Sequence, residues 1–188
     1  MNLLIFDNYD SFTYNIVHAV RQLGVNADVY RNDKIELKDV EKYDKIIISP
    51  GPGIPSEAGI LPELLKTYSQ TKPILGICLG HQAIGECFGA NLINLDDVFH
   101  GVQTDIKILD SADYLFEGLP QILSVGRYHS LVAAEETIPE MLQVVARSLD
   151  GEVMAVQHKE VPVYGLQFHP ESILTPEGLK IIGNWINH

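Results

Sequence analysis

Two short segments of this chain carry residues that could act together in catalysis. Residues 76–82 read Gly-Ile-Cys-Leu-Gly-His-Gln, and His169-Pro170-Glu171 follows far downstream. A thiol attacks as its thiolate, so it needs a base within hydrogen-bond reach and a third group that orients the base. In extended chain, residues two apart point the same way, which would place His169 and Glu171 together. The pattern predicts Cys78 as a nucleophile with His169 as its base and Glu171 as the orienting group.

The surroundings of Cys78 predict a sharp turn between a strand and a helix. Glycines at 76 and 80 flank the thiol, which lets the strand and the helix pack closely. The free N–H groups and the dipole at the start of the helix then favour the thiolate. The other cysteine, Cys87, has apolar neighbours, and we interpret it as a core residue in the middle of that helix.

A loop rich in proline and glycine, residues 49–55, follows an apolar run and would present its backbone. Because proline has no N–H, the available donors are those of Gly51 and Gly53. One of them, together with the N–H of Leu79, could form an oxyanion hole. A plain rigid turn is the equally good alternative at this point. The loop is not a phosphate loop, because no Gly-Lys-Ser/Thr follows it.

A metal site is the competing interpretation of the same residues. Cys78 and His81 have the spacing of metal ligands, and His129 and His169 could join them. However, the chain has no second cysteine pair, and His81 would lie on a helix rather than in a zinc knuckle. We therefore predict no metal.

The elements that must position these residues indicate an α/β fold. Continuous apolar runs at 3–6, 45–48 and 73–77 suit parallel strands that are covered on both faces. Helices are expected from near Ser11 to Gly24, through 61–68, and after Gly80. The order β-α-β-β-α-β-α favours a mostly parallel sheet with flanking helices and right-handed crossovers.

The second half of the chain is expected to add antiparallel strands. Shorter, often alternating runs follow Gly89, and Asp150-Gly151 is a strong hairpin signal. These strands are expected at 91–95, 104–109, 122–125, 141–147, 153–157 and 163–167. A last helix is expected over 176–187. We found no repeat and no linker, so residues 1–188 are expected to form a single domain.

Composition narrows the class of protein. The chain has 188 residues, 46% hydrophobic and 20% charged, which is typical of a globular domain. Its formal net charge of −12 argues against nucleic acid and against an anionic membrane surface as partners. Apolar runs are too short for a membrane span, and no signal peptide is expected at Met1. Two cysteines give no disulfide framework, so a cytoplasmic location is expected.

Taken together, these motifs resemble the class I (triad) glutamine amidotransferases over essentially the whole chain. The segment Asp7 to Asn15 and the segment Arg127 to Leu131 are similar to the glutamine-using subunits of anthranilate synthase and aminodeoxychorismate synthase. The resemblance implies a flavodoxin-like sheet of the class I amidotransferase type. It differs at Val102-Gln103-Thr104, where the family often has a lysine and small hydroxyl residues. This departure concerns the contacts of that loop with a partner or substrate and leaves the triad intact.

The resemblance implies roles for the site residues. Cys78 attacks the side-chain amide of L-glutamine, His169 activates the thiol and protonates the leaving ammonia, and Glu171 orients His169. A γ-glutamyl thioester forms, and water releases glutamate. The residues implied in holding glutamine and the oxyanion are Gly51, Pro52, Gly53, Leu79, Gln82, Ser130 and Leu131.

The resemblance also implies a partner, because ammonia released into neutral water is protonated and stops being a nucleophile. A larger synthase subunit would bind chorismate and Mg²⁺, so no cofactor is expected in this chain. The product would be anthranilate, for tryptophan, or aminodeoxychorismate, for folate, and one such chain could serve both. The segment Asp7 to Asn15 could dock the partner, and Asp10 or Ser11 could equally cap the first helix.

Two alternatives from other classes remain at this stage. The chain could be a non-catalytic flavodoxin-like binding module that has kept the turn at Cys78. It could also be a stand-alone thiol hydrolase of γ-glutamyl compounds. Labelling of Cys78 by a glutamine analogue discriminates against the first, and stable association with a chorismate-using enzyme discriminates against the second.

Overall fold

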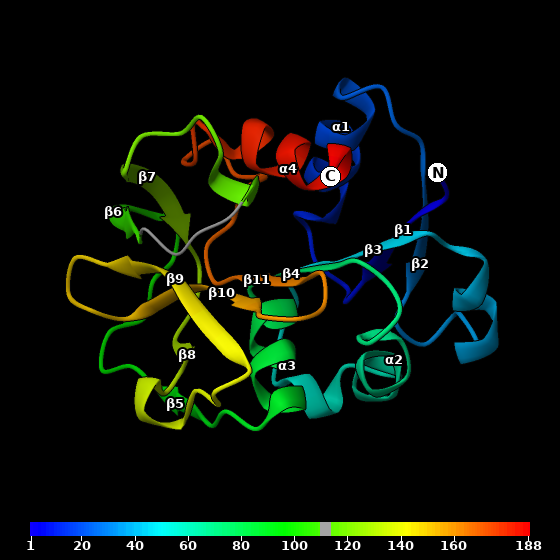
Figure 1. Cartoon of the computed structure of the whole chain (residues 1–188), viewed down its shortest axis with the longest axis horizontal. Helices are drawn as coiled ribbons and strands as arrows, with labels where there is room; N and C mark the ends of the chain where they lie inside the picture. Colours follow the sequence, from blue (N-terminus) through cyan, green and yellow to red (C-terminus); the bar gives the residue numbers. More distant parts are fainter. Residues whose placement is uncertain (110–113) are drawn as a thin grey trace.

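Apolar runs of the chain form the parallel half of a nine-stranded sheet in the computed structural model, which describes residues 1–109 and 114–188 (Figure 1). These parallel strands, in sheet order, are β2 (Ala27–Arg31), β1 (Leu3–Asp7), β3 (Lys45–Ile48), β4 (Ile74–Ile77) and β11 (Val163–Leu166). Side chains of β1 alternate between two apolar layers, with Leu3 and Ile5 in one and Leu4 and Phe6 in the other. The central strands are therefore buried on both faces, as parallel strands are.

Antiparallel strands extend the sheet beyond β11. In sheet order they are β10 (Val153–His158), β9 (Leu142–Ser148), β6 (Val102–Ile108) and β7 (Ile122–Arg127). The hairpin expected at Asp150-Gly151 connects β9 to β10, and Gly151 has a φ of 99°. A separate antiparallel pair joins β5 (Leu92–Asn94) to β8 (Leu131–Ala133). The expected α/β fold with added antiparallel strands is confirmed.

Helices cover both faces of the parallel half (Figure 1). Helices α1 (Thr13–Gln22) and α4 (Gly178–Asn187) pack on one face through residues such as Ile16 and Trp185. Helices α2 (Leu61–Tyr68) and α3 (Leu79–Phe88) pack on the other, through residues such as Leu64 and Ile84. Within the described part of the chain, no helix is both long and apolar enough to cross a membrane.

Several boundaries differ from the sequence expectation. The last helix begins at Gly178, so Pro176 lies before it rather than in its first turn. Neither Asp10 nor Ser11 caps α1: its N-cap residue is Phe12, and the Asp10 carboxylate accepts a hydrogen bond from the Phe12 N–H instead. Strand β8 was not expected, because three residues are too few to show a periodic pattern.

The start of α3 lies unusually close to the sheet. A Cβ added at Gly76 would lie 2.5 Å from the backbone C and O of Gly80. A Cβ added at Gly80 would in turn lie 2.8 Å from the carbonyl oxygen of Ile48 in β3. Both glycines are therefore required for the close approach, as expected from their positions beside Cys78.

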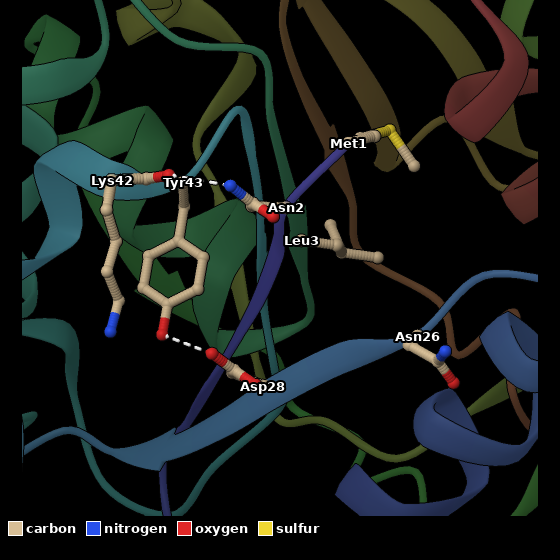
Figure 2. A pocket seen from close by; sticks show the side chains of 7 residues that line it. All are labelled: Met1, Asn2, Leu3, Asn26, Asp28, Lys42 and Tyr43. Carbon is tan, nitrogen blue, oxygen red and sulfur yellow. Dashed lines mark hydrogen bonds between the residues drawn. The ribbon is translucent and has the colours of Figure 1, made fainter.

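A surface pocket lies at the end of the sheet opposite to Cys78 and the start of α3 (Figure 2). It lies at the amino ends of β1 and β2, where Tyr43 donates a hydrogen bond of 2.8 Å to the Asp28 carboxylate. The residues that line it are Met1, Asn2, Leu3, Asn26, Asp28, Lys42 and Tyr43. Cys78 follows the carboxyl end of β4, so this pocket is separate from the predicted catalytic residues.

Replacing Gly76 by alanine should destabilise the fold by about 2 kcal/mol or more, because the added methyl group meets backbone atoms that cannot rotate away. Gly85→Ala is the matched control in α3, where the nearest atom, the Cβ of Ala90, lies at an ordinary 3.6 Å. It should be neutral or stabilise by up to about 1 kcal/mol, since alanine favours a helix. Urea unfolding measures both, and equal stabilities would contradict the close approach.

Candidate active site

Cys78 occupies the single residue between β4 and α3. Its φ of 52° and ψ of −100° are strained for an L-residue, as in the nucleophile turns of α/β hydrolases. The backbone is held on both sides: the Cys78 N–H donates to Leu166 over 2.7 Å, and its carbonyl accepts from the N–H of Gln82 over 3.0 Å. The first N–H groups of α3 have no partner within the helix and lie beside the cysteine. This geometry confirms the turn predicted at Cys78.

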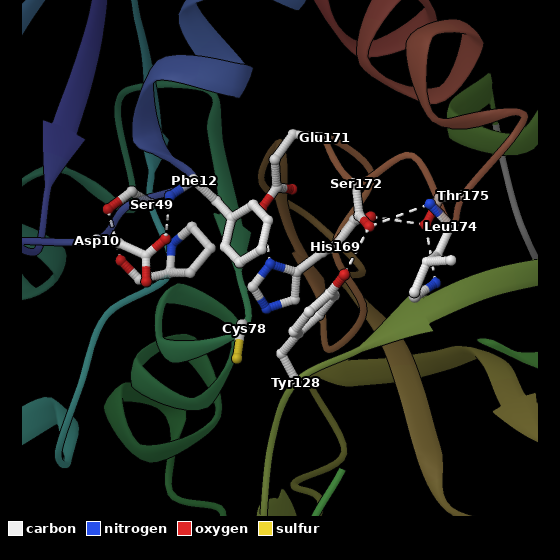
Figure 3. A network of polar contacts seen from close by, with 12 residues as sticks. Asp10, Phe12, Ser49, Cys78, Tyr128, His169, Glu171, Ser172, Leu174 and Thr175 are labelled. Atoms are coloured by element: carbon white, nitrogen blue, oxygen red, sulfur yellow. Dashed lines mark hydrogen bonds and ion pairs between the residues drawn. The ribbon is translucent and has the colours of Figure 1, made fainter. Parts of the chain in front are cut away.

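His169 and Glu171 follow β11, the strand next to β4. The Nδ1 of His169 lies 2.7 Å from Oε1 of Glu171, and both side chains are almost completely buried. Figure 3 shows the other ring nitrogen of His169, Nε2, facing the sulfur of Cys78. The backbone of His169 is fixed by a hydrogen bond to the Gly126 carbonyl. The structure therefore brings the three predicted catalytic residues together.

The electrostatics of His169 favour its protonated form. Burial alone lowers its pKa, but the interactions with Cys78 and Glu171, including their negative charges, outweigh burial and raise the pKa to about 10. An imidazolium between a sulfur and a carboxylate is the arrangement in which a thiolate is stabilised at neutral pH.

Two aromatic rings hold the imidazole in this position. The ring of Phe12, just before α1, lies 5.4 Å from the His169 ring and nearly perpendicular to it. The ring of Tyr128 lies 4.7 Å from the imidazole and 4.9 Å from Phe12. Tyr128 is fixed in turn by a hydrogen bond of 3.0 Å between its hydroxyl and that of Ser172 (Figure 3). Together these contacts restrict rotation of the imidazole ring.

The proline- and glycine-rich loop lies against the start of α3. A Cβ added at Gly51 would lie 2.8 Å from Cδ2 of Leu79 and 2.5 Å from Cβ of Asn8. The loop is fixed by hydrogen bonds of 2.9 Å between Asn8 and Ser49. Gly51 is thus brought next to Leu79, whereas Pro52 and Gly53 continue into solvent. Of the two glycines considered for an oxyanion hole, Gly51 is the one that contacts the predicted partner Leu79.

The predicted glutamine-holding residues also meet. The Gln82 side-chain nitrogen donates to the Leu131 carbonyl over 3.0 Å, and Ser130 precedes Leu131 at the start of β8. His129 lies 3.1 Å from that same carbonyl through Nδ1 and accepts from Arg127 through Nε2. Burial, followed by the charge of Arg127, lowers the pKa of His129 to about 3, so the ring is neutral. It is therefore a fixed support for the Ser130–Leu131 backbone.

The support behind His129 is a buried ion pair. Arg127, whose side chain is 1% exposed, lies 2.6 Å from the carboxylate of Glu152 in the β9–β10 turn. Its guanidinium also stacks 3.6 Å above the ring of Phe99. The sequence analysis marked Arg127 to Leu131 as one segment but gave Arg127 no role and considered His129 only as a metal ligand.

Some site residues were missed entirely. The amide nitrogen of Gln167 lies 3.7 Å from Sγ of Cys78 and donates to it. The alternation that pairs His169 with Glu171 would also have included Gln167, two residues earlier. Phe12 and Tyr128 gave no signal, because their contacts with His169 depend on how α1 and β7 pack.

Other predictions about single residues have mixed outcomes. Cys87 is the last but one residue of α3, so its expected place in the middle of the helix is wrong, and it packs against the core while only partly buried. Val102-Gln103-Thr104 begins β6, and Gln103 donates to the Leu174 carbonyl just beyond Glu171. Among the residues that the structure describes, no group of three histidine, cysteine or acidic side chains could hold a metal ion, so the metal alternative gains no support.

Removing either neighbour of His169 should lower its pKa. In Glu171→Gln and in Cys78→Ala, one raising interaction is lost while burial continues to lower the value. The imidazolium signal, followed by NMR during a pH titration, should therefore disappear at lower pH than in the unmodified protein. Tyr14→Phe, on the exposed side of α1, is the control and should leave the titration unchanged. An unchanged titration in both site variants would contradict the arrangement.

Comparison with known proteins shows which proteins this chain is similar to. A family model described as glutamine amidotransferase class-I matches residues 4–188. The chain is similar to the bifunctional protein TrpGD of Thermotoga maritima, at 45% identity over 189 residues. The match covers 98% of this chain but only about a third (32%) of that protein. It is similar to aminodeoxychorismate/anthranilate synthase component 2 of Bacillus subtilis, at 43% identity over 186 residues, which are 98% of this chain and 95% of that protein.

Among solved structures, a protein from Thermoplasma acidophilum that is named as part of a GMP synthase has a similar fold. The TM-score is 0.89 and the sequence identity is 28%. The match covers 100% of this chain and 92% of that one.

Proposed function

Because this chain belongs to the class-I glutamine amidotransferases, we propose that it takes ammonia from L-glutamine and passes it to a larger, chorismate-using synthase subunit. The observation that carries the proposal is Cys78 at a strained strand–helix turn, facing an imidazole that is held by Glu171. The product on this proposal is anthranilate. Aminodeoxychorismate is the second candidate, because the name of the Bacillus subtilis relative joins both synthases.

The first half of the reaction forms a thioester. The Cys78 thiolate attacks the side-chain carbonyl carbon of glutamine, and the oxygen gains negative charge. The N–H groups of Gly51 and Leu79 would hold that charge, and one such donor is typically worth about 3 kcal/mol. When the tetrahedral intermediate collapses, the C–N bond breaks and His169 gives its Nε2 proton to the leaving nitrogen. Ammonia and a γ-glutamyl thioester result.

The second half releases glutamate. His169, now neutral, takes a proton from water, and the hydroxide attacks the thioester carbon. The C–S bond breaks, the thiolate of Cys78 leaves, and the imidazolium forms again. Glu171 keeps the ring oriented and stabilises its charge in both halves, since Nδ1 remains bonded to the carboxylate.

The amino acid end of glutamine would be held at Gln82 and the Ser130–Leu131 backbone. The side-chain nitrogen of Gln82 already donates to two acceptors, Leu131 and Gln167. The oxygen of the same amide is the atom that can accept from the α-ammonium group. Pro52 and Gly53, on the exposed side of the loop, would line the entrance.

The partner subunit would dock beside His169. We assign the docking surface to three exposed residues of the segments that flank this edge of the site: Tyr9, Tyr14 and Ile173, with exposed fractions of 47%, 62% and 93%. Residues of α1 and of the loop after Glu171 line one shared groove, so these segments are neighbours. Phe12, between Tyr9 and Tyr14, contacts the imidazole. Any Mg²⁺ required for the chorismate chemistry would belong to the partner.

A glutamine analogue that carries a reactive ketone should label Cys78 and leave Cys87 unlabelled. Burial raises the pKa of the Cys87 thiol and outweighs the opposing effect of the nearby Lys66 charge. Cys78→Ser should lose at least about a thousandfold in glutaminase turnover, as loss of a nucleophile does, while Cys87→Ser should retain it. Peptide mass spectrometry locates the label, and labelling that persists in Cys78→Ser would contradict the role of Cys78.

Association with the synthase should raise glutaminase turnover and should depend on the docking surface. Ile173→Asp should weaken binding to the synthase by tenfold or more, because it places a charge in an apolar contact. Met141→Asp, at an apolar residue that is 46% exposed and lies beside Lys159, is the control and should bind normally.

Pull-down with each candidate synthase, followed by product analysis with glutamine as the nitrogen source, identifies the pathway. Anthranilate alone, aminodeoxychorismate alone, or both would assign the chain. Equal turnover with and without a bound partner would contradict partner-dependent activation. A chain that binds neither synthase but hydrolyses γ-glutamyl compounds would be a stand-alone hydrolase.

A further inference from the structure

Gln167 is a buried amide whose place is fixed by both neighbouring strands. It follows the last residue of β11, and Leu166 pairs in register with Ile77, the residue before Cys78. Its own N–H donates to the Met154 carbonyl in β10 over 2.9 Å. The side chain is 0% exposed, and its nitrogen donates to Sγ of Cys78. The register of two strands therefore sets this amide beside the sulfur.

The orientation of the amide is set by a second glutamine. The carbonyl of Leu131 can only accept, so the atom of Gln82 that faces it must be the nitrogen. That nitrogen also donates to Oε1 of Gln167 over 3.4 Å. With its oxygen occupied in this way, Gln167 presents its NH₂ group to the sulfur.

The chain of contacts continues to the antiparallel half of the sheet. The Leu131 carbonyl lies within reach of His129, and His129 accepts from Arg127, which pairs with Glu152. The ordered sequence from the turn to the sulfur is Glu152, Arg127, His129, Leu131, Gln82, Gln167 and Cys78. Because Arg127, His129, Gln82 and Gln167 are buried, none of these side chains can reorient without leaving a polar group unpaired.

We propose that Gln167 is a positioning residue for Cys78, which holds the sulfur by an N–H···S hydrogen bond and favours its thiolate form. The proposal rests on the proposed function of Cys78 as the nucleophile. His169 approaches the sulfur with a positive charge, and Gln167 adds a neutral donor that does not change charge during the reaction. The sulfur thus keeps one fixed partner when His169 gives up its proton.

The titratable groups around the sulfur are few. His169 faces it, with Glu171 behind, and Asp10 and His129 interact electrostatically with His169. His81 on α3 is completely buried, and burial lowers its pKa to about 4, so it stays neutral. A change in the pH dependence of Cys78 after substitution of Gln167 therefore reports on the amide itself.

The test measures alkylation of Cys78 by iodoacetamide as a function of pH, in the full chain with Cys87→Ser. Gln167→Met keeps the volume and removes the donor. This substitution should slow alkylation at neutral pH by about fivefold or more. It should also raise the midpoint of the curve of alkylation rate against pH by roughly one pH unit, as expected for a lost hydrogen bond to an anion. Gln167→Glu should raise the midpoint further, because a carboxylate opposes the thiolate. Gln143→Glu, a half-buried glutamine in β9, is the control and should leave rate and midpoint unchanged.

An unchanged midpoint in Gln167→Met and Gln167→Glu, in folded protein, would overturn the proposal. If neither variant folds, the unmodified protein decides: the side-chain amide signals of Gln167 should shift with the ionisation of Cys78 in an NMR titration, and signals that do not move would overturn it. Iodoacetamide needs no glutamine, so the result is separate from the proposed function. If the protein hydrolyses glutamine but alkylation is unaltered in the variants, only the role proposed for Gln167 is contradicted, and the proposed function stands.

Discussion

The left-handed backbone of Cys78 is the constraint on which the rest of the site depends. A residue with a φ of 52° must end β4 and begin α3 at once, and the helix then has to start almost in contact with β3 and β4. Only glycine at 76 and 80 leaves room for that approach. The strain is offset by a sheet whose central strands are buried on both faces, and Cys78 is thereby placed at the start of α3, beside its free N–H groups.

Parallel strand pairing explains why the base is found where it is. In β4 and β11 the chain runs in the same direction and in register, so the residues after each strand emerge at one edge. Cys78 follows one strand and His169 the other. Part of the substrate site comes from elsewhere: Leu131 lies in the small two-stranded sheet, supported by the ion pair of Arg127. Substrate binding thus combines Gln82, on the helix that begins at Cys78, with a second structural unit.

The sequence predicted the local parts of this site well and the long-range parts poorly. Cys78 between two glycines, and His169 two residues before Glu171, are visible because residue type and spacing carry the information. Gln167 was missed because its orientation depends on Gln82, which Leu131 fixes only when α3 and β8 have packed together. Phe12 and Tyr128 were missed for the same reason. Boundaries such as the start of α4 at Gly178 differ because turns, not periodicity, decide them.

The place of β11 in the sheet also determines when the site can form as the chain is synthesised and folds. Among the strands that the structure describes, β11 comes latest in chain order, yet it lies between β4 and β10 and joins the parallel half to the antiparallel half. Until it inserts, Cys78 has neither its imidazole nor its amide neighbour and is an ordinary thiol. A growing chain therefore cannot assemble the catalytic residues around this sulfur until β11 has been made and has joined the sheet.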